Sequence, residues 1–154
     1  MDSRLAVLAI GGNSLIKDKN SVALQEQYEA VKETTAYVAD LIDAGLNMVI
    51  THGNGPQVGF ILRRSELSRQ ELHEVPLDVC GADTQGAIGY ALQQNLINDL
   101  RRLGIDKTVA TVVTQVEVAR GDPAFLEPSK PIGSFLDRDE ALRRRDREGW
   151  HVVE

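Results

Sequence analysis

Two short apolar runs that each end in a glycine-rich turn constrain the fold of this chain more than any other feature. Leu5–Ile10 ends at Gly11-Gly12, and Leu46–Ile50 leads into the cluster Gly53–Pro56. A continuous apolar run bounded by glycine is typical of a strand that is buried on both faces. Apolar residues recur at helical spacing over 21–44, so a helix is expected to connect the two strands.

The rest of the chain continues the alternation of helices and strands. Apolar spacing and turn residues predict helices over 56–69, 83–103 and 137–148, a loop over 68–76, and strands over 108–118 and 150–153. The segment 119–136 is rich in proline and glycine, which predicts irregular structure or short hairpins. This alternation favours an α/β fold with a mainly parallel sheet.

The predicted helix over 83–103 carries a single apolar stripe that has two interpretations. The stripe consists of Ile88, Leu92, Leu96, Leu100 and Leu103. It can pack into the core of the domain, and it can equally form the interface of a dimer.

Composition and charge exclude several classes of protein. With 154 residues, the chain is long enough for one domain with its own core. Its net charge of -6 argues against a nucleic-acid or anionic-membrane partner, so any anion site has to be built locally. The single cysteine, Cys80, permits no intramolecular disulfide. Because Leu5–Ile10 is too short for a signal peptide or a membrane span, we predict a cytoplasmic protein.

The two glycine-rich turns are candidate phosphate-binding loops. Gly11, Gly12 and Asn13 follow the first strand, and the stretch His52–Gln57 follows the second. The carboxyl ends of parallel strands share one sheet edge, where backbone N–H groups and helix N-termini bind anions. Asn13, Asn54 and Gln57 add neutral donors. Tight strand-to-helix turns without a ligand remain an alternative, since neither loop matches the dinucleotide fingerprint or the P-loop.

A series of short motifs runs from one end of the chain to the other. These motifs are Ala9–Leu15, Val49–Gly59, Pro76–Gly81, Thr84–Tyr90, Thr111–Val116, Asp122–Phe125 and Lys130–Gly133. In this order they resemble the carbamate kinases, and the resemblance covers essentially the whole chain. Other members of the superfamily have a lysine two residues before the Gly-Gly turn, where this chain has Ala9. The absence of that lysine is similar to carbamate kinases and counts against an acetylglutamate or uridylate kinase.

The resemblance implies a fold, a reaction and roles for individual residues. The fold is the three-layer αβα sandwich of the amino-acid kinases, with a small protruding hairpin subdomain, or flap, near 117–136. The reaction is reversible phosphoryl transfer between ATP and carbamate, with Mg²⁺ as the metal. By motif, the transferring phosphoryl group is held by Gly11, Gly12 and Asn13. Carbamate or carbamoyl phosphate is held by Gly53, Asn54 and Gly55, with Gln57 as a further donor. Lys130 is the catalytic residue, on the flap.

Residues 1–154 are expected to form the carbamate-binding N-terminal lobe of such an enzyme, without the nucleotide-binding C-terminal lobe. The chain alone is then expected to be inactive, with either a second copy or a complementing C-terminal half as its partner. The alternative is a non-catalytic anion-binding or assembly protein with the same fold. No zinc site is expected, because His73 and His151 have no ligand-like spacing with cysteine or carboxylates.

Several other polar residues have structural interpretations. His52 is expected to form structural hydrogen bonds, Asp78 and Asp83 to orient the start of a helix, and Cys80 to pack in the interior. The arginines at 143–145 alternate with acidic residues, which favours a solvated helix face over a basic binding patch.

Overall fold

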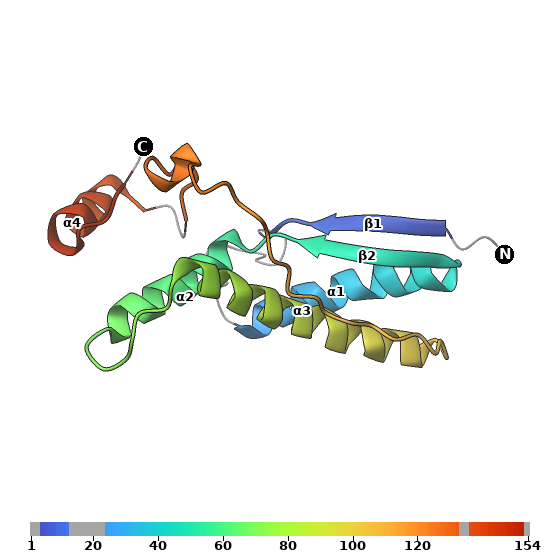
Figure 1. Ribbon diagram of the computed structural model, residues 1–154. Coiled ribbons are helices and arrows are strands. Elements are labelled where there is room, and N and C mark those ends of the chain that lie inside the picture. The colour runs from blue at the N-terminus through green and yellow to red at the C-terminus, as the bar shows by residue number, and fades with distance from the viewer. Residues whose placement is uncertain (1–3, 13–23, 133–135, 153–154) are drawn as a thin grey trace.

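The computed structural model describes residues 4–12, 24–132 and 136–152 (Figure 1). Its elements, in chain order, are β1 (Arg4–Ile10), α1 (Leu24–Asp43), β2 (Leu46–His52), α2 (Gly55–Ser68), α3 (Leu77–Arg102), the 3-10 helix η2 (Pro123–Phe125) and α4 (Arg138–Glu148). No helix among these residues is long and apolar enough to cross a membrane.

The two predicted apolar strands form a parallel pair, which confirms the α/β fold with a parallel sheet. β1 and β2 run in register, with Leu8 opposite Ile50 and Ile10 opposite His52. The crossover between them is α1, and Gly45, two residues after its last residue, has a positive φ of 92°. A left-handed conformation after the last helical turn favours glycine, which has no β-carbon to clash.

The core lies between one face of the sheet and the two long helices α1 and α3 (Figure 1). Its buried members include Ile10, Val31, Val38, Ile42, Ile88, Leu92, Leu96 and Leu100, with Leu8, Met48 and Ile50 packed against them. The apolar stripe of α3 is therefore core, except for Leu103 at its end, which is 45% exposed. Core packing accounts for this stripe without a dimer interface.

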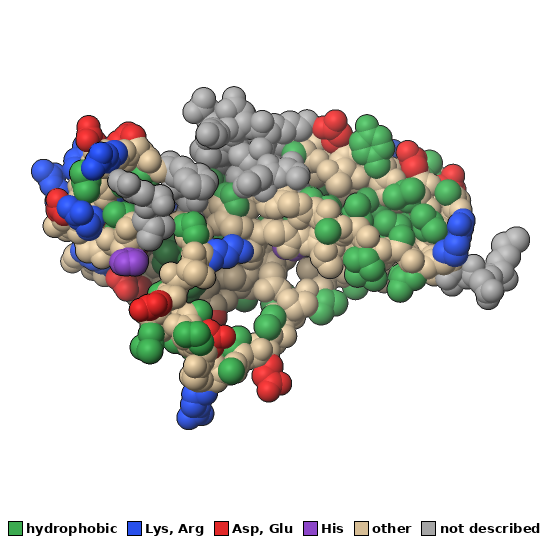
Figure 2. Space-filling view, turned by 90° about the horizontal axis from the view of Figure 1, so that it is seen from above, with side chains coloured by type: hydrophobic (Ala, Val, Ile, Leu, Met, Phe, Trp, Pro, Cys, Tyr) green, Lys and Arg blue, Asp and Glu red, His purple; other side chains and the backbone are tan. Residues whose placement is uncertain are grey.

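The opposite face of the sheet is exposed, so the prediction that the first strand is buried on both faces is wrong for the described part of the chain. Leu5 and Val7 of β1 are 67% and 68% exposed, and Val49 of β2 is 45% exposed. Figure 2 shows hydrophobic side chains gathered over the strands on this side. Side chains alternate between faces along a strand, and the helices cover only one face. The third layer of the predicted sandwich is not among the described residues.

The segment 108–118 was predicted as a strand and is not one. It runs alongside α3 (Figure 1), where the Thr114 N–H donates to Gln85 Oε1 at 2.8 Å and Thr111 Oγ1 donates to Gln93 Oε1 at 2.9 Å. A β-carbon on Gly89 would overlap the Thr111 side chain, so the glycine permits this close approach. A sequence rich in β-branched residues favours an extended backbone, but a β-strand also needs hydrogen bonds to the backbone of a neighbouring strand. Here the segment bonds instead to the side-chain amides of Gln85 and Gln93 on α3.

Three further boundaries differ from those predicted. α3 begins at Leu77 rather than at 83, because extended Pro76 precedes it and Asp78 in its first turn complements the helix dipole. Residues 150–152 are not a strand, and Val153 lies outside the described residues. The described part of 117–136 contains η2, with the Asp122 side chain accepting from the Ala124 N–H, but no hairpin.

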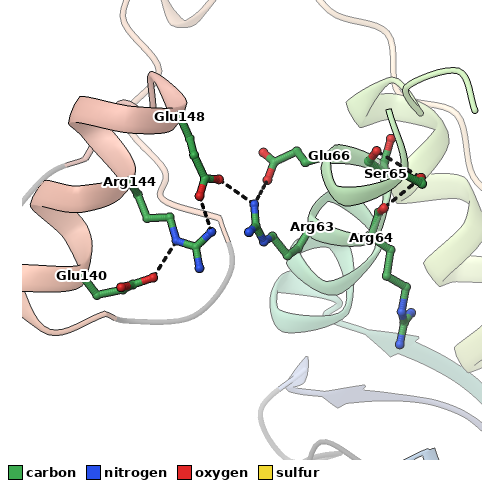
Figure 3. Close-up of polar contacts among 8 residues, drawn as sticks. Arg63, Arg64, Ser65, Glu66, Glu140, Arg144 and Glu148 are labelled. Atoms are coloured by element: carbon green, nitrogen blue, oxygen red, sulfur yellow. Dashed lines mark hydrogen bonds and ion pairs between the residues drawn. The ribbon is translucent and has the colours of Figure 1, made fainter. Parts of the chain in front are cut away.

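A charged cluster joins α4 to α2 (Figure 3). Arg63 Nη1 of α2 lies 2.7 Å from Glu148 Oε2 of α4 and 3.0 Å from Glu66 Oε2. Glu148 also pairs with Arg144 at 2.6 Å. The guanidinium groups of Arg63 and Arg144 lie 5.7 and 5.5 Å from the centre of the Trp150 ring. The predicted solvated helix face is thus only partly right, because Arg144 pairs with Glu148, which in turn links α4 to Arg63 of α2.

Candidate anion-binding site

The two glycine-rich turns meet, backbone against backbone, at the carboxyl edge of the sheet. The Gly53 N–H donates to the Ile10 carbonyl at 2.8 Å. A β-carbon added to Gly53 would lie 2.9 Å from Gly12 N, and one added to Gly12 would lie 3.0 Å from Gly53 C. Neither glycine has a positive φ, so it is the close approach of the two turns that requires glycine here.

The N-terminus of α2 opens directly from the second turn. Asn54 is its N-cap residue, but its side chain makes no capping hydrogen bond, and Pro56 in the first turn has no N–H to donate. The amides of Gly55 and Gln57 therefore have no side-chain cap, and the helix dipole adds positive potential at the same place. Such an end attracts a carboxylate or a phosphate.

The Asn54 side chain is held instead by a buried threonine of α3. Asn54 Nδ2 donates to Thr84 Oγ1 at 2.7 Å, and Thr84 Oγ1 donates in turn to the Gly81 carbonyl at 2.8 Å. Thr84 is 1% exposed. Sequence reasoning missed Thr84 as a site residue; the motif Thr84–Tyr90 was noticed, but a contact across 30 residues has no local signature.

Gln57 is buried in the first turn of α2 with its polar atoms unused. Gln57 is only 7% exposed, and neither Nε2 nor Oε1 of its side chain has a hydrogen-bond partner. An unpaired buried polar group costs about 1–3 kcal/mol, so such groups are rare outside functional sites. A primary amide offers both a donor and an acceptor, and this one belongs to the third residue of the helix that follows the second glycine turn.

His52 and Cys80 lie near these residues in structural roles. His52 Nδ1 is 3.3 Å from the Gly53 carbonyl, as expected of a histidine that orders its own turn. Cys80 is fully buried, as predicted, and its thiol is 3.7 Å from the Val75 carbonyl. Burial raises the pKa of the Cys80 thiol, and the nearby carboxylates of Asp83 and Asp78 raise it further. The thiol form is favoured, so Cys80 is a poor nucleophile.

The structure brings together most, but not all, of the residues predicted for the site. Gly11, Gly12, Gly53, Asn54, Gly55 and Gln57 lie at one sheet edge. Asn13 lies outside the described residues. Lys130 is exposed in the loop after η2 and makes no hydrogen bond or ion pair with any residue described here.

The magnesium ion implied by the resemblance finds no ligand set in the described residues. Nowhere in 4–12, 24–132 and 136–152 do three His, Cys, Asp or Glu side chains gather closely enough to hold a metal ion. Magnesium prefers oxygen ligands that include carboxylates. The glycine turns and neutral amides fit an anion and do not fit Mg²⁺.

Comparisons with known proteins agree with the fold and the motifs, although no family model matches the chain. It is 46% identical over 151 residues to the carbamate kinase of Thermococcus kodakarensis, and 49% identical over 155 residues to the carbamate kinase-like protein YahI of Escherichia coli. These alignments cover 96% and 97% of this chain. The solved structure of a Giardia lamblia carbamate kinase bound to citric acid superposes with a TM-score of 0.89 at 34% identity, covering 94% of this chain.

The chain spans about half the length of these relatives. It covers 48% of each of the two relatives compared by sequence, and 47% of the Giardia chain. At 34–49% identity over nearly all of this chain, shared ancestry accounts for both the sequence and the fold. In sequence and in fold, the chain corresponds to the N-terminal half of the carbamate kinases, which have the amino-acid kinase fold.

Proposed function

We propose that this chain is the carbamate- and phosphate-binding lobe of a carbamate kinase, which transfers a phosphoryl group reversibly between ATP and carbamate. One observation carries the proposal: two glycine turns lie in backbone contact beside an uncapped helix N-terminus and the unpartnered amide of Gln57. This arrangement suits a small, planar anion that needs several neutral donors.

In this proposal the residues of the chain bind and orient the acceptor. Gly11, Gly12 and Asn13 hold the transferring phosphoryl group, and Gly53, Asn54 and Gly55 hold carbamate or carbamoyl phosphate. Gln57 adds a further donor, and Lys130 closes over the anion on the flap near 117–136. Phosphoryl transfer depends mainly on positioning and on neutralising charge, and backbone amides with one lysine supply part of both.

The nucleotide and the metal are held by residues outside this chain. A Giardia relative was solved with AMP-PNP bound, which supports ATP as the phosphoryl donor of the family. The described residues offer no carboxylate cluster for Mg²⁺. The partner is then a complementing C-terminal half, and the exposed sheet face around Val7 and Val49 is apolar enough to need such a cover. A homodimer and a cytoplasmic location are further parts of the proposal.

The test is a coupled assay with ATP, Mg²⁺ and carbamate on the purified chain, with and without the separately expressed second half of a full-length relative. We expect no turnover from the chain alone and turnover when the second half is added. The matched control replaces Asn54 by Ala in this chain, which should lower the restored activity without changing the fold measured by circular dichroism.

Binding of carbamoyl phosphate to the chain alone separates the remaining outcomes. Chemical-shift changes confined to the turns at 11–12 and 53–57, at millimolar ligand, would support a preformed half-site. Turnover by the chain alone would contradict the assignment of nucleotide binding to another half. Ligand binding without turnover in any mixture would favour the alternative, a non-catalytic anion-binding or assembly protein.

A further inference from the structure

The buried hydroxyl of Thr84 is the only described group that holds the Asn54 side chain. Thr84 lies on the core face of α3, spaced four residues from Cys80 and from Ile88, both of which are buried. Because the helix is anchored on both sides of it, Thr84 offers a rigid point of attachment 30 residues along the chain from the turn it contacts.

The hydrogen bonds of Thr84 also fix which way the Asn54 amide is turned. A hydroxyl has one proton, and that of Thr84 is donated to the Gly81 carbonyl at 2.8 Å, which can only accept. The Thr84 oxygen is therefore left as an acceptor. Asn54 has to present its NH₂ group to it, at 2.7 Å, and not its carbonyl oxygen.

We propose that Thr84 is a positioning residue that selects one orientation of the Asn54 side-chain amide. It thereby fixes on which side of Asn54 the ligand meets a hydrogen-bond donor and on which side it meets an acceptor. Asn54 keeps one N–H and its Oδ1 for the ligand, in a fixed arrangement. A ligand whose own donor and acceptor match this order binds better than one that requires the flipped amide. Because the ligand is the one given by the proposed function, this role rests on that function.

Removal of the hydroxyl should free the amide to flip. Thr84→Val leaves the Asn54 NH₂ without its acceptor, so the ordered amide becomes a mixture of two orientations. The loss of one neutral hydrogen bond should weaken the binding of carbamoyl phosphate by about 2- to 10-fold. Thr84→Ser keeps the hydroxyl and should restore both the orientation and the affinity.

The experiment compares the wild-type chain with Thr84→Val, Thr84→Ser and Asn54→Ala. The first readout is the pair of Asn54 side-chain N–H signals in a ¹⁵N NMR spectrum without ligand. The second is the titration of each protein with carbamoyl phosphate in the cold, with inorganic phosphate as the comparison ligand. If Thr84→Val fails to fold by circular dichroism, Thr84→Ala, which also lacks the hydroxyl, takes its place.

We expect the Asn54 signals to move in Thr84→Val and to return in Thr84→Ser, with the affinity following them. Unchanged Asn54 signals in Thr84→Val would overturn the role of Thr84, whatever the ligand does. So would a Thr84→Val protein that binds carbamoyl phosphate as tightly as the wild type while Asn54→Ala binds weakly; the proposed function would then stand. If the wild-type chain binds no carbamoyl phosphate, the proposed function fails, and the role of Thr84 fails with it.

Discussion

Gly53 shows how strongly a single missing side chain can constrain a site. The space for its β-carbon is filled by the backbone of Gly12, at 2.9 Å, and backbone cannot rotate out of the way as a side chain can. Gly55, two residues on, has no atom within 4 Å of its β-carbon position. The two glycines of one motif therefore differ in what they tolerate.

Replacing Gly53 by Ala should lower the free energy of unfolding by about 1–3 kcal/mol, because the two turns have to move apart. Replacing Gly55 by Ala should leave it unchanged or raise it by up to about 1 kcal/mol, since alanine restricts the unfolded chain. Urea denaturation of the two variants beside the wild type measures both effects. Equal stabilities for the two variants would contradict the close contact of the turns.

At the residue scale, sequence reasoning found the backbone part of the site and missed what holds it. Gly12 and Gly53 were identified because a glycine turn after an apolar strand is a local pattern. The contact between Asn54 and Thr84 joins residues 30 positions apart, and a lone threonine within a helix has no distinguishing pattern. The unpartnered state of Gln57 likewise depends on burial, which appears only once the elements are packed.

At the scale of elements, α4 is attached to α2 mainly by charge. None of its residues is buried, and its contact with α2 is the cluster of Arg63, Glu148, Arg144 and Trp150. Partial desolvation opposes ionisation of Glu148, but the hydrogen bonds and charges of Arg63 and Arg144 together outweigh it and hold the pKa of Glu148 below its ordinary value.

A group whose pKa is lowered by folding stabilises the folded form above its unfolded pKa and loses that effect as the pH falls through the folded pKa. We therefore expect α4 to lose its amide-exchange protection in acid, as the pH falls below the ordinary pKa range of a glutamate, before the core does. Glu148→Gln should show the same loss near neutral pH. Hydrogen exchange resolved by peptide measures both.

The control for this prediction is Glu66→Gln. Glu66 pairs with the same Arg63 but lies on α2, so its loss leaves the link to α4 in place. Protection of α4 that is equal in Glu148→Gln and in Glu66→Gln would contradict a specific role of Glu148 in the docking of α4.

The elements also show where sequence patterns stop being sufficient. Helices over 24–43, 55–68 and 138–148 agree with their periodicity to within a few residues, since that pattern is local. The segment 108–118 has the composition of a strand but lies against α3. Strand pairing depends on a neighbouring strand, and the composition of a segment does not show whether one is present. The α2–α4 contact was missed for the same reason.

At the scale of the whole molecule, the sheet has one covered and one bare face. Val7 and Val49 lie opposite each other in register on the bare face. An apolar surface of this kind promotes association with another chain or with a copy of itself. The parallel sheet could be predicted from the two apolar runs. The same runs predicted strands buried on both faces, whereas the described residues cover only one face of the sheet.

Replacing both Val7 and Val49 by Thr should reduce self-association and the binding of a fluorescent dye that recognises apolar surface. The free energy of unfolding should change by less than about 0.5 kcal/mol, as for surface substitutions in general. Ile50→Thr, next to Val49 but facing the core, should destabilise by about 1–3 kcal/mol. Analytical ultracentrifugation over a concentration series, together with urea denaturation, measures these effects. A double Thr variant as unstable as Ile50→Thr would show that the bare face is covered in solution.

The position of Trp150 has a practical consequence for following the unfolding of this molecule. It is the only tryptophan in the chain, and its ring lies close to the guanidinium groups of Arg63 and Arg144 at the α2–α4 contact, outside the core clusters. Its fluorescence therefore reports the detachment of one helix, while far-ultraviolet circular dichroism reports the loss of all helices. A fluorescence midpoint below the dichroism midpoint would mark a partly unfolded state with α4 released and the glycine turns still in contact.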